Sequence, residues 1–298
     1  MRVSSTLSFS ALLLMAATAP PLCADATATT AESADPAETV PLWEWSLAAF
    51  TRYGASYPGS DESQFNFVPL PFPKYRGKFL RVGDETENPI RGRIFRRDRI
   101  KLDIDFDLNF SSDSDDIDAR TGMPDLDFLL EVGPELELQF AERSPLAGAD
   151  LFLGLQLRAA TSWDGVDPSF QGLIFSPELK WRKKLSRERR SELKFRITPG
   201  FATDDYMDYF YGVEPQFVTP DRPAFDAKGG YLGTDFTLSL RQALGKRYEI
   251  YAGVRLSALS GAKNEDSPLF KDDFNTAVIA AFLWKFWESD RRVPADED

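Results

Sequence analysis

Three aspartates stand at alternate positions of one stretch of the chain, Asp103, Asp105 and Asp107. If the stretch is extended, their side chains share one face and lie about 6–7 Å apart. Neighbouring carboxylates can act as general acid and base when their pKa values are driven apart. The same row also suits ion pairing with cations, or selection among solutes that pass along it. We favour structural ion pairing over solute selectivity, and solute selectivity over catalysis.

The sequence contains no histidine, and its only cysteine is Cys23. Histidine is the commonest general base, the commonest metal ligand and the usual partner of a nucleophilic serine. We therefore expect no catalytic residue, no metal and no other cofactor, which disfavours a hydrolase. The formal charge of -12 also disfavours nucleic acid as a partner.

A second acidic cluster, Asp113-Ser-Asp-Asp-Ile-Asp118, carries the oxygen ligands that calcium prefers. It lacks the glycine and the distal glutamate of an EF-hand loop. We expect a solvated surface loop here in preference to a calcium site. Cation bridging to lipopolysaccharide stays open for any outer loop.

The aspartate row belongs to a longer pattern, because apolar residues alternate with polar ones from Ile100 to Phe110. Strands of soluble proteins usually have about 5–6 residues, whereas a tilted strand that crosses a bilayer needs about 9–11. The length therefore favours a membrane-spanning strand. Similar alternation places charges of both signs on one face of later segments. The candidate charge network of this face comprises Arg91, Arg93, Asp103, Asp105, Asp107, Glu135, Glu137, Arg158, Lys180, Arg182 and Arg196, with Lys194 and Arg255 as further cations.

The first residues predict an export signal: a positive start at Arg2, an apolar run from Phe9 to Ala19, and the cleavage motif Ala24-Asp25-Ala26. Cys23 would leave with this signal peptide, and the residues before it suit a lipoprotein signal poorly. No later apolar run is long enough for a transmembrane helix, so any membrane span must be a barrel. We predict a signal peptide at 1–26, a flexible leader at 27–41, a barrel at 42–287 and an acidic tail at 288–298.

The alternating segments predict an all-β, antiparallel transmembrane β-barrel of about twelve strands. The expected strands are 43–53, 64–73, 79–83, 90–97, 100–110, 128–140, 150–162, 173–185, 191–202, 230–244, 248–259 and 275–287. Short connections at 98–99, 186–190 and 245–247 alternate with long ones at 111–127, 203–229 and 260–274. Outer-membrane barrels have short periplasmic turns, longer outer loops and usually an even strand number. Both termini are then periplasmic, and we expect the aromatic loop 203–229 to fold into the barrel rather than bind a partner.

The hairpin centred on Asp98 provides a register, which pairs Arg93 with Asp103 and Arg91 with Asp105 across the inner wall. A soluble periplasmic sandwich or lipocalin-like barrel would alternate too, with its apolar face turned inward. Strand length, charge and aromatic residues near strand ends argue against that alternative. We expect a crowded, charge-paired interior, which disfavours a wide porin.

Three separated stretches resemble a known family. Tyr57-Pro58-Gly59-Ser60-Asp61, with Pro69-Leu-Pro-Phe-Pro73 and Tyr75-Arg-Gly77 after it, resembles the amino-terminal signature of the MipA/OmpV family of outer-membrane proteins. Tyr209-Phe-Tyr211-Gly212-Val213 with Pro223-Ala-Phe-Asp-Ala227, and later Ser267-Pro268-Leu269, resemble further elements of that family. Their order and spacing span nearly the whole predicted mature chain.

The resemblance implies a non-enzymatic barrel in the outer membrane of a Gram-negative bacterium, in contact with lipid and lipopolysaccharide and inserted by the barrel-assembly machinery. For the MipA branch it implies a scaffold between a lytic transglycosylase and a bifunctional penicillin-binding protein in murein synthesis. One departure is the acidic segment that follows Trp284-Lys-Phe286, where such barrels commonly end on an aromatic residue. The alternative function is a narrow channel for small solutes.

Overall fold

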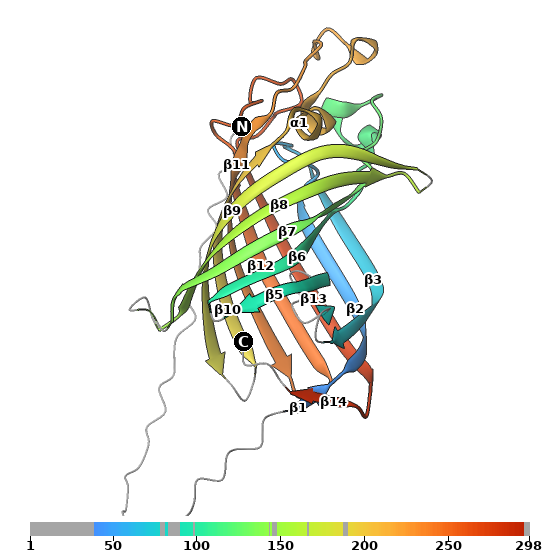
Figure 1. Cartoon of the computed structure of the whole chain (residues 1–298). Coiled ribbons are helices and arrows are strands. Elements are labelled where there is room, and N and C mark those ends of the chain that lie inside the picture. The colour runs from blue at the N-terminus through green and yellow to red at the C-terminus, as the bar shows by residue number, and fades with distance from the viewer. Residues whose placement is uncertain are drawn as a thin grey trace, which may run out of the picture. The chain divides into compact units, whose positions relative to one another are not determined.

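Alternating apolar and polar residues form twelve antiparallel strands that close into a barrel in the computed structural model (Figure 1). The structure describes residues 39–77, 81–82, 90–97, 99–142, 144, 148–165, 167–186 and 190–294, with only the backbone of 81–82 and 90–96. The predicted signal peptide and most of the predicted leader lie outside this part.

The barrel strands are β2 (Trp43–Ala55), β3 (Ser63–Arg76), β4 (Arg81–Val82), β5 (Ile90–Arg97), β6 (Ile100–Asn109), β7 (Phe128–Ala141), β8 (Asp150–Trp163), β9 (Pro168–Ser186), β10 (Ser191–Ala202), β11 (Gly230–Leu244), β12 (Tyr248–Ala258) and β13 (Phe274–Glu288). Each pairs with its neighbour in the chain, and β13 pairs with β2 to close the barrel. The predicted fold and all twelve predicted strands are confirmed. The main differences are β9, which starts five residues earlier than predicted, and β4, of which the structure describes Arg81–Val82 within the predicted 79–83.

The surface of the barrel is apolar outside and mostly polar inside. On β2, Glu44 and Ser46 face inward and are 7% and 2% exposed, whereas the outward Leu47 is 45% exposed. On β13 the outward Val278 and Phe282 are 50% and 44% exposed. This orientation is opposite to that of a lipocalin-like barrel, and it removes that alternative. The described helices include none long and apolar enough to cross a membrane.

The inner wall is not uniform along its circumference, although ion pairs such as Lys74 with Glu249 also occur on β3 and β12. Charged residues line it along β6 to β10, as the sequence predicts. Along β2, β3, β12 and β13 it carries an apolar cluster that the sequence analysis did not predict, formed by Ala48, Phe72, Tyr251, Ala281 and Leu283, with Phe50, Leu70 and Ile279 packed against it. The interior is therefore not uniformly charge-paired.

The register of the β5–β6 hairpin confirms one predicted pair. Arg93 lies opposite Asp103, and Gly92 lies opposite Ile104. Next to the turn the register differs from the predicted one by one residue, because Arg97 pairs with Ile100. A bulge between Arg93 and Phe95 adds one residue to β5, and beyond it the observed register equals the predicted one. On the other edge of β5, Arg91 lies opposite Arg81 of β4.

Between β3 and β6, the described strands share few backbone pairs. Residues 63–74 of β3 pair only with β2 among the described strands, and residues 105–109 of β6 pair only with β7. The short β4 joins β3 to β5 at the level of Tyr75 and Arg76. We call the line bounded by residues 63–74 and 105–109 the β3–β6 seam.

Proline chemistry matches this seam. Pro69, Pro71 and Pro73 occupy alternate positions of β3, so the N–H groups that they lack would all point to the same side of the strand. β2 is paired through all three positions, so the missing donors lie on the side away from β2. These prolines thus occupy the edge of β3 that has no partner in the described ladder.

The two ends of the described chain meet outside the barrel. β1 (Thr39–Pro41) and β14 (Arg292–Pro294) form a two-stranded antiparallel sheet at the end opposite α1 (Asp204–Tyr211) (Figure 1). The sequence predicts a flexible leader up to residue 41, so strand β1 corrects the end of that leader, and the predicted acidic tail contains the short strand β14. The two strands are about 250 residues apart in the chain, so no local sequence pattern could have predicted their pairing.

Candidate functional site

Arg158 on β8 is the centre of the first group of lumen charges. Its guanidinium lies 3.1 Å from Asp105 on β6 and 3.0 Å from Glu131 on β7, with Asp107 at 3.9 Å. It also donates a hydrogen bond to Gln156 at 3.2 Å. Asp105 and Glu131 are buried, so one cation neutralises two carboxylates away from water. The aspartate row is arranged here for ion pairing.

Lys180 on β9 is the centre of a second group. Its Nζ lies 2.8 Å from Glu137, 3.3 Å from Glu178 and 3.9 Å from Glu135. Lys101 reaches the other oxygen of Glu137 at 3.3 Å. This group therefore extends from β6 to β9 around the inner wall.

The remaining predicted cations with described side chains pair with acidic residues that lie outside β6, the strand of the aspartate row. The contacts are Arg196 with Glu178 at 3.8 Å, Arg182 with Asp150 at 3.9 Å and over the Phe152 ring at 4.5 Å, Lys194 with Glu192 at 3.1 Å, and Arg255 with Asp235 at 3.8 Å. Asp103 is buried opposite Arg93. The side chains of Arg91 and Arg93 lie outside the described part of the structure.

Several charged residues of the site are absent from the predicted charge network, among them Glu178, Asp235, Arg52 and Arg120. Glu178 and Asp235 occupy inward positions of alternating strands, so the period-two pattern contained the information needed to find them. Arg52 stands on β2 among inward residues that are mostly small or apolar. Arg120 lies in the short helix η2 (Asp118–Arg120), where no periodic pattern marks it.

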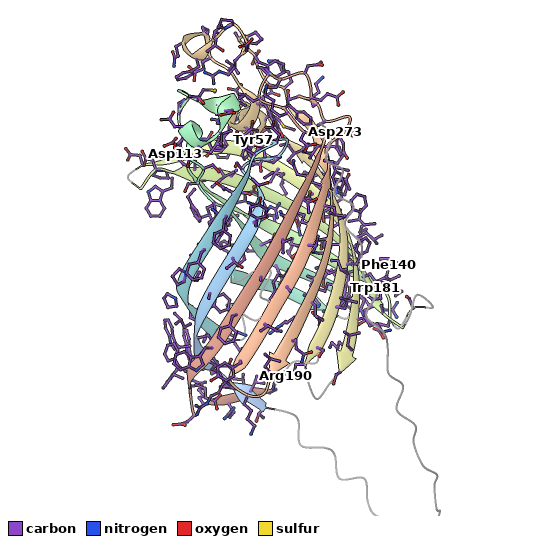
Figure 2. All side chains as sticks on the ribbon, turned by 180° about the vertical axis from the view of Figure 1, so that it is seen from behind. Tyr57, Asp113, Phe140, Trp181, Arg190 and Asp273 are labelled. Atoms are coloured by element: carbon purple, nitrogen blue, oxygen red, sulfur yellow. The ribbon has the colours of Figure 1, made fainter. Side chains whose placement is uncertain are left out.

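The loops at one end of the barrel form a packed cap, which comprises residues 56–62, 110–127, 203–229 and 259–273. Figure 2 shows Tyr57, Asp113 and Asp273 at this end and Arg190 at the other. The cap and the adjoining inner wall share one buried hydrophobic cluster. It consists of Tyr57, Ile117, Leu126, Leu129, Ala160, Ile174, Tyr206, Met207, Phe210, Tyr211 and Ala227. Helix α1 contributes four of these residues, so the prediction that the loop 203–229 folds inward is confirmed.

The three stretches that resemble the family signature meet in the cap. The Tyr211 hydroxyl donates to the Pro58 carbonyl at 3.0 Å, and the Ser267 hydroxyl donates to the Tyr211 carbonyl at 2.8 Å. Gly59 has a φ of +85°, and a Cβ there would lie 2.8 Å from the Phe270 ring. Residues far apart in the chain thus have one joint role, which is to hold the loops together.

Two buried polar residues connect the cap to its surroundings. The Tyr206 hydroxyl donates to Glu131 at 2.9 Å, which joins α1 to the Arg158 group. Arg120 donates to the Phe210 carbonyl at 3.2 Å and to the Pro124 carbonyl at 3.1 Å. The cap and the charged lumen are therefore one connected structure.

The acidic loop at 113–118 uses its carboxylates locally. Asp113 accepts a hydrogen bond from the Asp115 amide at 2.9 Å and caps η1 (Ser114–Asp116). Asp115 accepts from the Gly122 amide at 3.3 Å. Within the described residues, no group of three or more acidic or cysteine side chains is arranged to hold a metal ion.

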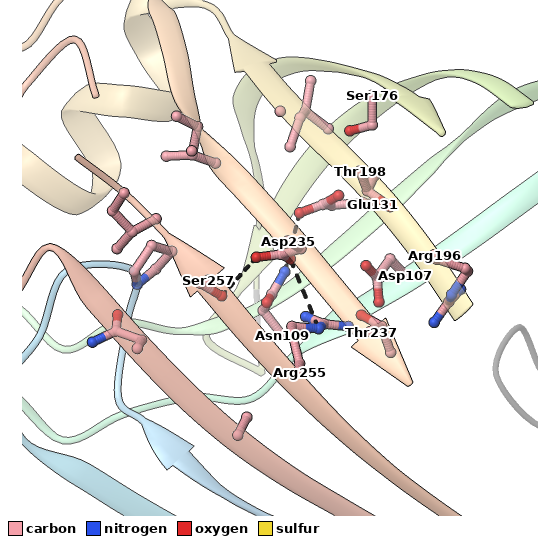
Figure 3. Close-up of a pocket in the computed structure, with 18 of the residues that line it drawn as sticks. Asp107, Asn109, Glu131, Ser176, Arg196, Thr198, Asp235, Thr237, Arg255 and Ser257 are labelled. Carbon is pink, nitrogen blue, oxygen red and sulfur yellow. Dashed lines mark hydrogen bonds and ion pairs between the residues drawn. The ribbon is translucent and has the colours of Figure 1, made fainter. Parts of the chain in front are cut away.

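Two adjoining cavities lie below the cap. The larger has a volume of about 200 Å³ and is lined mainly by charged and polar side chains, among them Arg158, Glu131 and Asp235. Figure 3 shows Asp235 between Ser257, which donates to it at 2.6 Å, and Arg255. The smaller cavity has a volume of about 130 Å³. Both are lined by Arg52, Asp107, Asn109, Arg196 and Arg255, so the two cavities share part of their walls.

Tyr57 makes the stability of the cap sensitive to alkaline pH. Burial raises the pKa of its phenol to about 12, against the opposing effect of the Arg120 guanidinium. In the unfolded chain tyrosine ionises near pH 10. The stabilising contribution of Tyr57 is therefore fully present below pH 10 and is lost as the pH rises towards 12. Thermal unfolding followed by gel mobility between pH 9 and 12 should show a falling midpoint.

The control for this pH prediction is Tyr57→Phe, which has no ionisable group. Its midpoint should fall less steeply, while Tyr206, Tyr209 and Tyr211, whose pKa values are also raised by burial, keep part of the slope. Equal slopes for the variant and the wild type would contradict the role of Tyr57.

Comparisons with known proteins add the following findings. The family model described as "MltA-interacting protein MipA" matches residues 47–286. No curated protein matches the chain. Among solved structures 23 chains match. One is described as "CymD monoaromatic hydrocarbon channel", with 10% sequence identity, a TM-score of 0.34, and coverage of 82% of this chain and 88% of that one.

Proposed function

Because the chain belongs to the MipA family, we propose that it is a non-enzymatic outer-membrane barrel that acts as a scaffold for murein-synthesising complexes. Its partners in this proposal are a lytic transglycosylase and a bifunctional penicillin-binding protein. The family description as MltA-interacting protein supports the first partner.

The observation that carries the proposal is the packed cap over an ion-paired lumen. The cap buries four aromatic residues, Tyr57, Tyr206, Phe210 and Tyr211, and it is bonded to the lumen through Glu131. A wide channel needs a hydrated path at this place, whereas a scaffold needs only a stable body with an accessible periplasmic surface. The packed cap therefore supports the scaffold over a wide open channel.

The outward surface supports an outer-membrane location. Trp43, Trp45, Trp284 and Trp287 are exposed near the strand ends opposite the cap, and Trp163 is exposed near the cap end. Aromatic residues at both ends of an apolar band are typical of interfacial girdles. Heat-modifiable gel mobility and fractionation of the envelope test this part, and a fully soluble product would contradict it.

The scaffold role predicts binding at the end of the barrel opposite the cap. Affinity capture from detergent-solubilised envelopes should recover the transglycosylase and the penicillin-binding protein. Lys246→Ser combined with Arg247→Ser changes an exposed turn at that end and should lower recovery several-fold. Lys228→Ser combined with Lys263→Ser removes the same charges from the cap loops and should leave recovery unchanged.

The same purified protein distinguishes the scaffold from the channel. We expect no stepwise conductance in planar bilayers and no liposome swelling by small sugars. Conductance together with failed capture of both murein enzymes would replace the scaffold by the channel.

A further inference from the structure

The two ends of the barrel carry opposite charge. By sequence, the cap contains eighteen acidic and five basic residues, which gives it a formal charge of -13. The six connections at the other end contain nine basic and four acidic residues, which gives them a formal charge of +5. We call these connections the basic rim, and they comprise residues 77–80, 98–99, 142–149, 187–190, 245–247 and 289–291.

Two cations next to the basic rim lie on the outer face of the barrel. Arg97 of β5 lies opposite Ile100 of β6, and Lys183 of β9 lies opposite Leu193 of β10. Directly opposite residues of paired strands project to the same face of a sheet. Ile100 is 43% exposed at an outward position, and so is Leu185, two residues after Lys183, with 50%. Both cations therefore lie on the face that lipid covers.

Neither of these two cations is neutralised by a described carboxylate. Within the described residues, no acidic side chain lies within ion-pair distance of Arg97 or Lys183. Glu192, on the strand next to Lys183, pairs with Lys194 at 3.1 Å instead. The charges of Arg97 and Lys183 are therefore directed at the surroundings of the barrel.

Tryptophan residues indicate the depth of these cations in the bilayer. Five of the six tryptophans lie at this end of the barrel, namely Trp43, Trp45, Trp181, Trp284 and Trp287. Figure 2 shows Trp181 on the outside of the barrel, and tryptophan collects at the level of lipid headgroups. Lys183 follows about 6–7 Å farther along the same strand towards the rim. A long cationic side chain at this depth lays its stem on the acyl chains and its charge among the headgroups.

We propose that Arg97 and Lys183 bind the headgroup phosphates of anionic phospholipid in the leaflet that surrounds the basic rim. Their outward direction favours lipid over a soluble anionic partner, because such a partner approaches the rim from the aqueous side. The cap, with its formal charge of -13, repels the same lipid. This contact is separate from the scaffold role, whose test changes Lys246 and Arg247.

Quenching of tryptophan fluorescence by brominated phospholipids tests the contact, because most tryptophans lie at this end. The full chain is reconstituted in mixtures of phosphatidylglycerol and phosphatidylcholine, and each lipid in turn carries the bromine. At low salt we expect a roughly two- to five-fold preference for phosphatidylglycerol at the protein surface, the upper value being the effect of one cation near an anionic surface. The preference should fall towards one in about 1 M NaCl, which shortens the Debye length to about 3 Å.

Variants assign the preference to the two cations. Arg97→Ser combined with Lys183→Ser should lower the preference by roughly half or more, whereas Arg97→Lys combined with Lys183→Arg should keep it. Lys228→Ser combined with Lys263→Ser is the matched control, because both lysines are exposed in the cap loops. It should leave the preference unchanged. Heat-modifiable mobility shows that each variant folds.

Equal quenching by the two lipids, a preference that persists at high salt, or an equal loss in the cap control would overturn the proposal. Glycerophosphoglycerol carries the same phosphate without acyl chains, and in excess it should leave the preference unchanged. Competition by this soluble compound would show that the rim binds anions from solution and would overturn the assignment to lipid.

Discussion

Replacement of Arg158 by methionine is expected to lower the free energy of unfolding by roughly 3–5 kcal/mol, the usual cost of removing one partner from a buried ion pair. The variant leaves Asp105 and Glu131 buried without the cation that lies 3.1 Å and 3.0 Å from them. Carboxylates in this position must take up protons or water. The measurement is equilibrium unfolding in urea, followed by tryptophan fluorescence in detergent micelles.

Two further variants separate the charge of Arg158 from its volume. Arg158→Lys keeps a cation and should lose less stability than Arg158→Met. Combination of Arg158→Met with Glu131→Leu and Asp105→Leu removes the uncompensated charges and should recover much of the loss, because apolar replacements of a whole buried ion group are often neutral or stabilising. A stability of Arg158→Met within about 0.5 kcal/mol of the wild type, the range of ordinary surface substitutions, would contradict the role of this arginine.

Replacement of Tyr211 by alanine is expected to cost roughly 3–5 kcal/mol and to loosen the cap, as removal of a large buried aromatic side chain does. Tyr211 is 1% exposed, its ring contacts Phe210 and Phe270, and its hydroxyl donates to Pro58. It therefore holds together loops from three parts of the chain. Trypsin added to the cap side of reconstituted protein should cleave the loop 203–229 faster in the variant.

Tyr211→Phe is the matched control, because it keeps the ring and loses only the hydrogen bond to Pro58. It should cost about 0.5–1.5 kcal/mol, the usual net worth of one hydrogen bond, and leave the rate of proteolysis nearly unchanged. If phenylalanine and alanine at this position have the same effect, the packing of the ring is not what holds the cap.

The barrel was predictable because membrane-spanning strands repeat a local pattern. The alternation from Ile100 to Phe110 is a property of consecutive residues, and so are the short turns that set the strand order. The pair Arg93 and Asp103 was also predictable, since a hairpin register follows from its turn. The bulge beside Arg93 was not predictable, because it depends on how the wall curves.

The ion-pair partners were harder to predict than the residues. Arg158 reaches across β7 to Asp105, so its partner lies two strands away, and that relation depends on the tilt and stagger of the whole barrel. The role of Arg120 in the cap left no pattern in the sequence. The joining of Tyr57, Tyr211 and Ser267 in one cap depends on loops whose shape is fixed only by their mutual packing.

The prolines of β3 also bear on how copies of this chain behave beside one another. A free strand edge is normally a template for a second chain, which adds its own strand through backbone hydrogen bonds. Pro69, Pro71 and Pro73 remove the donor from every second residue along that edge. Neighbouring barrels that collide in a crowded membrane therefore cannot add a fully hydrogen-bonded strand along this stretch of β3.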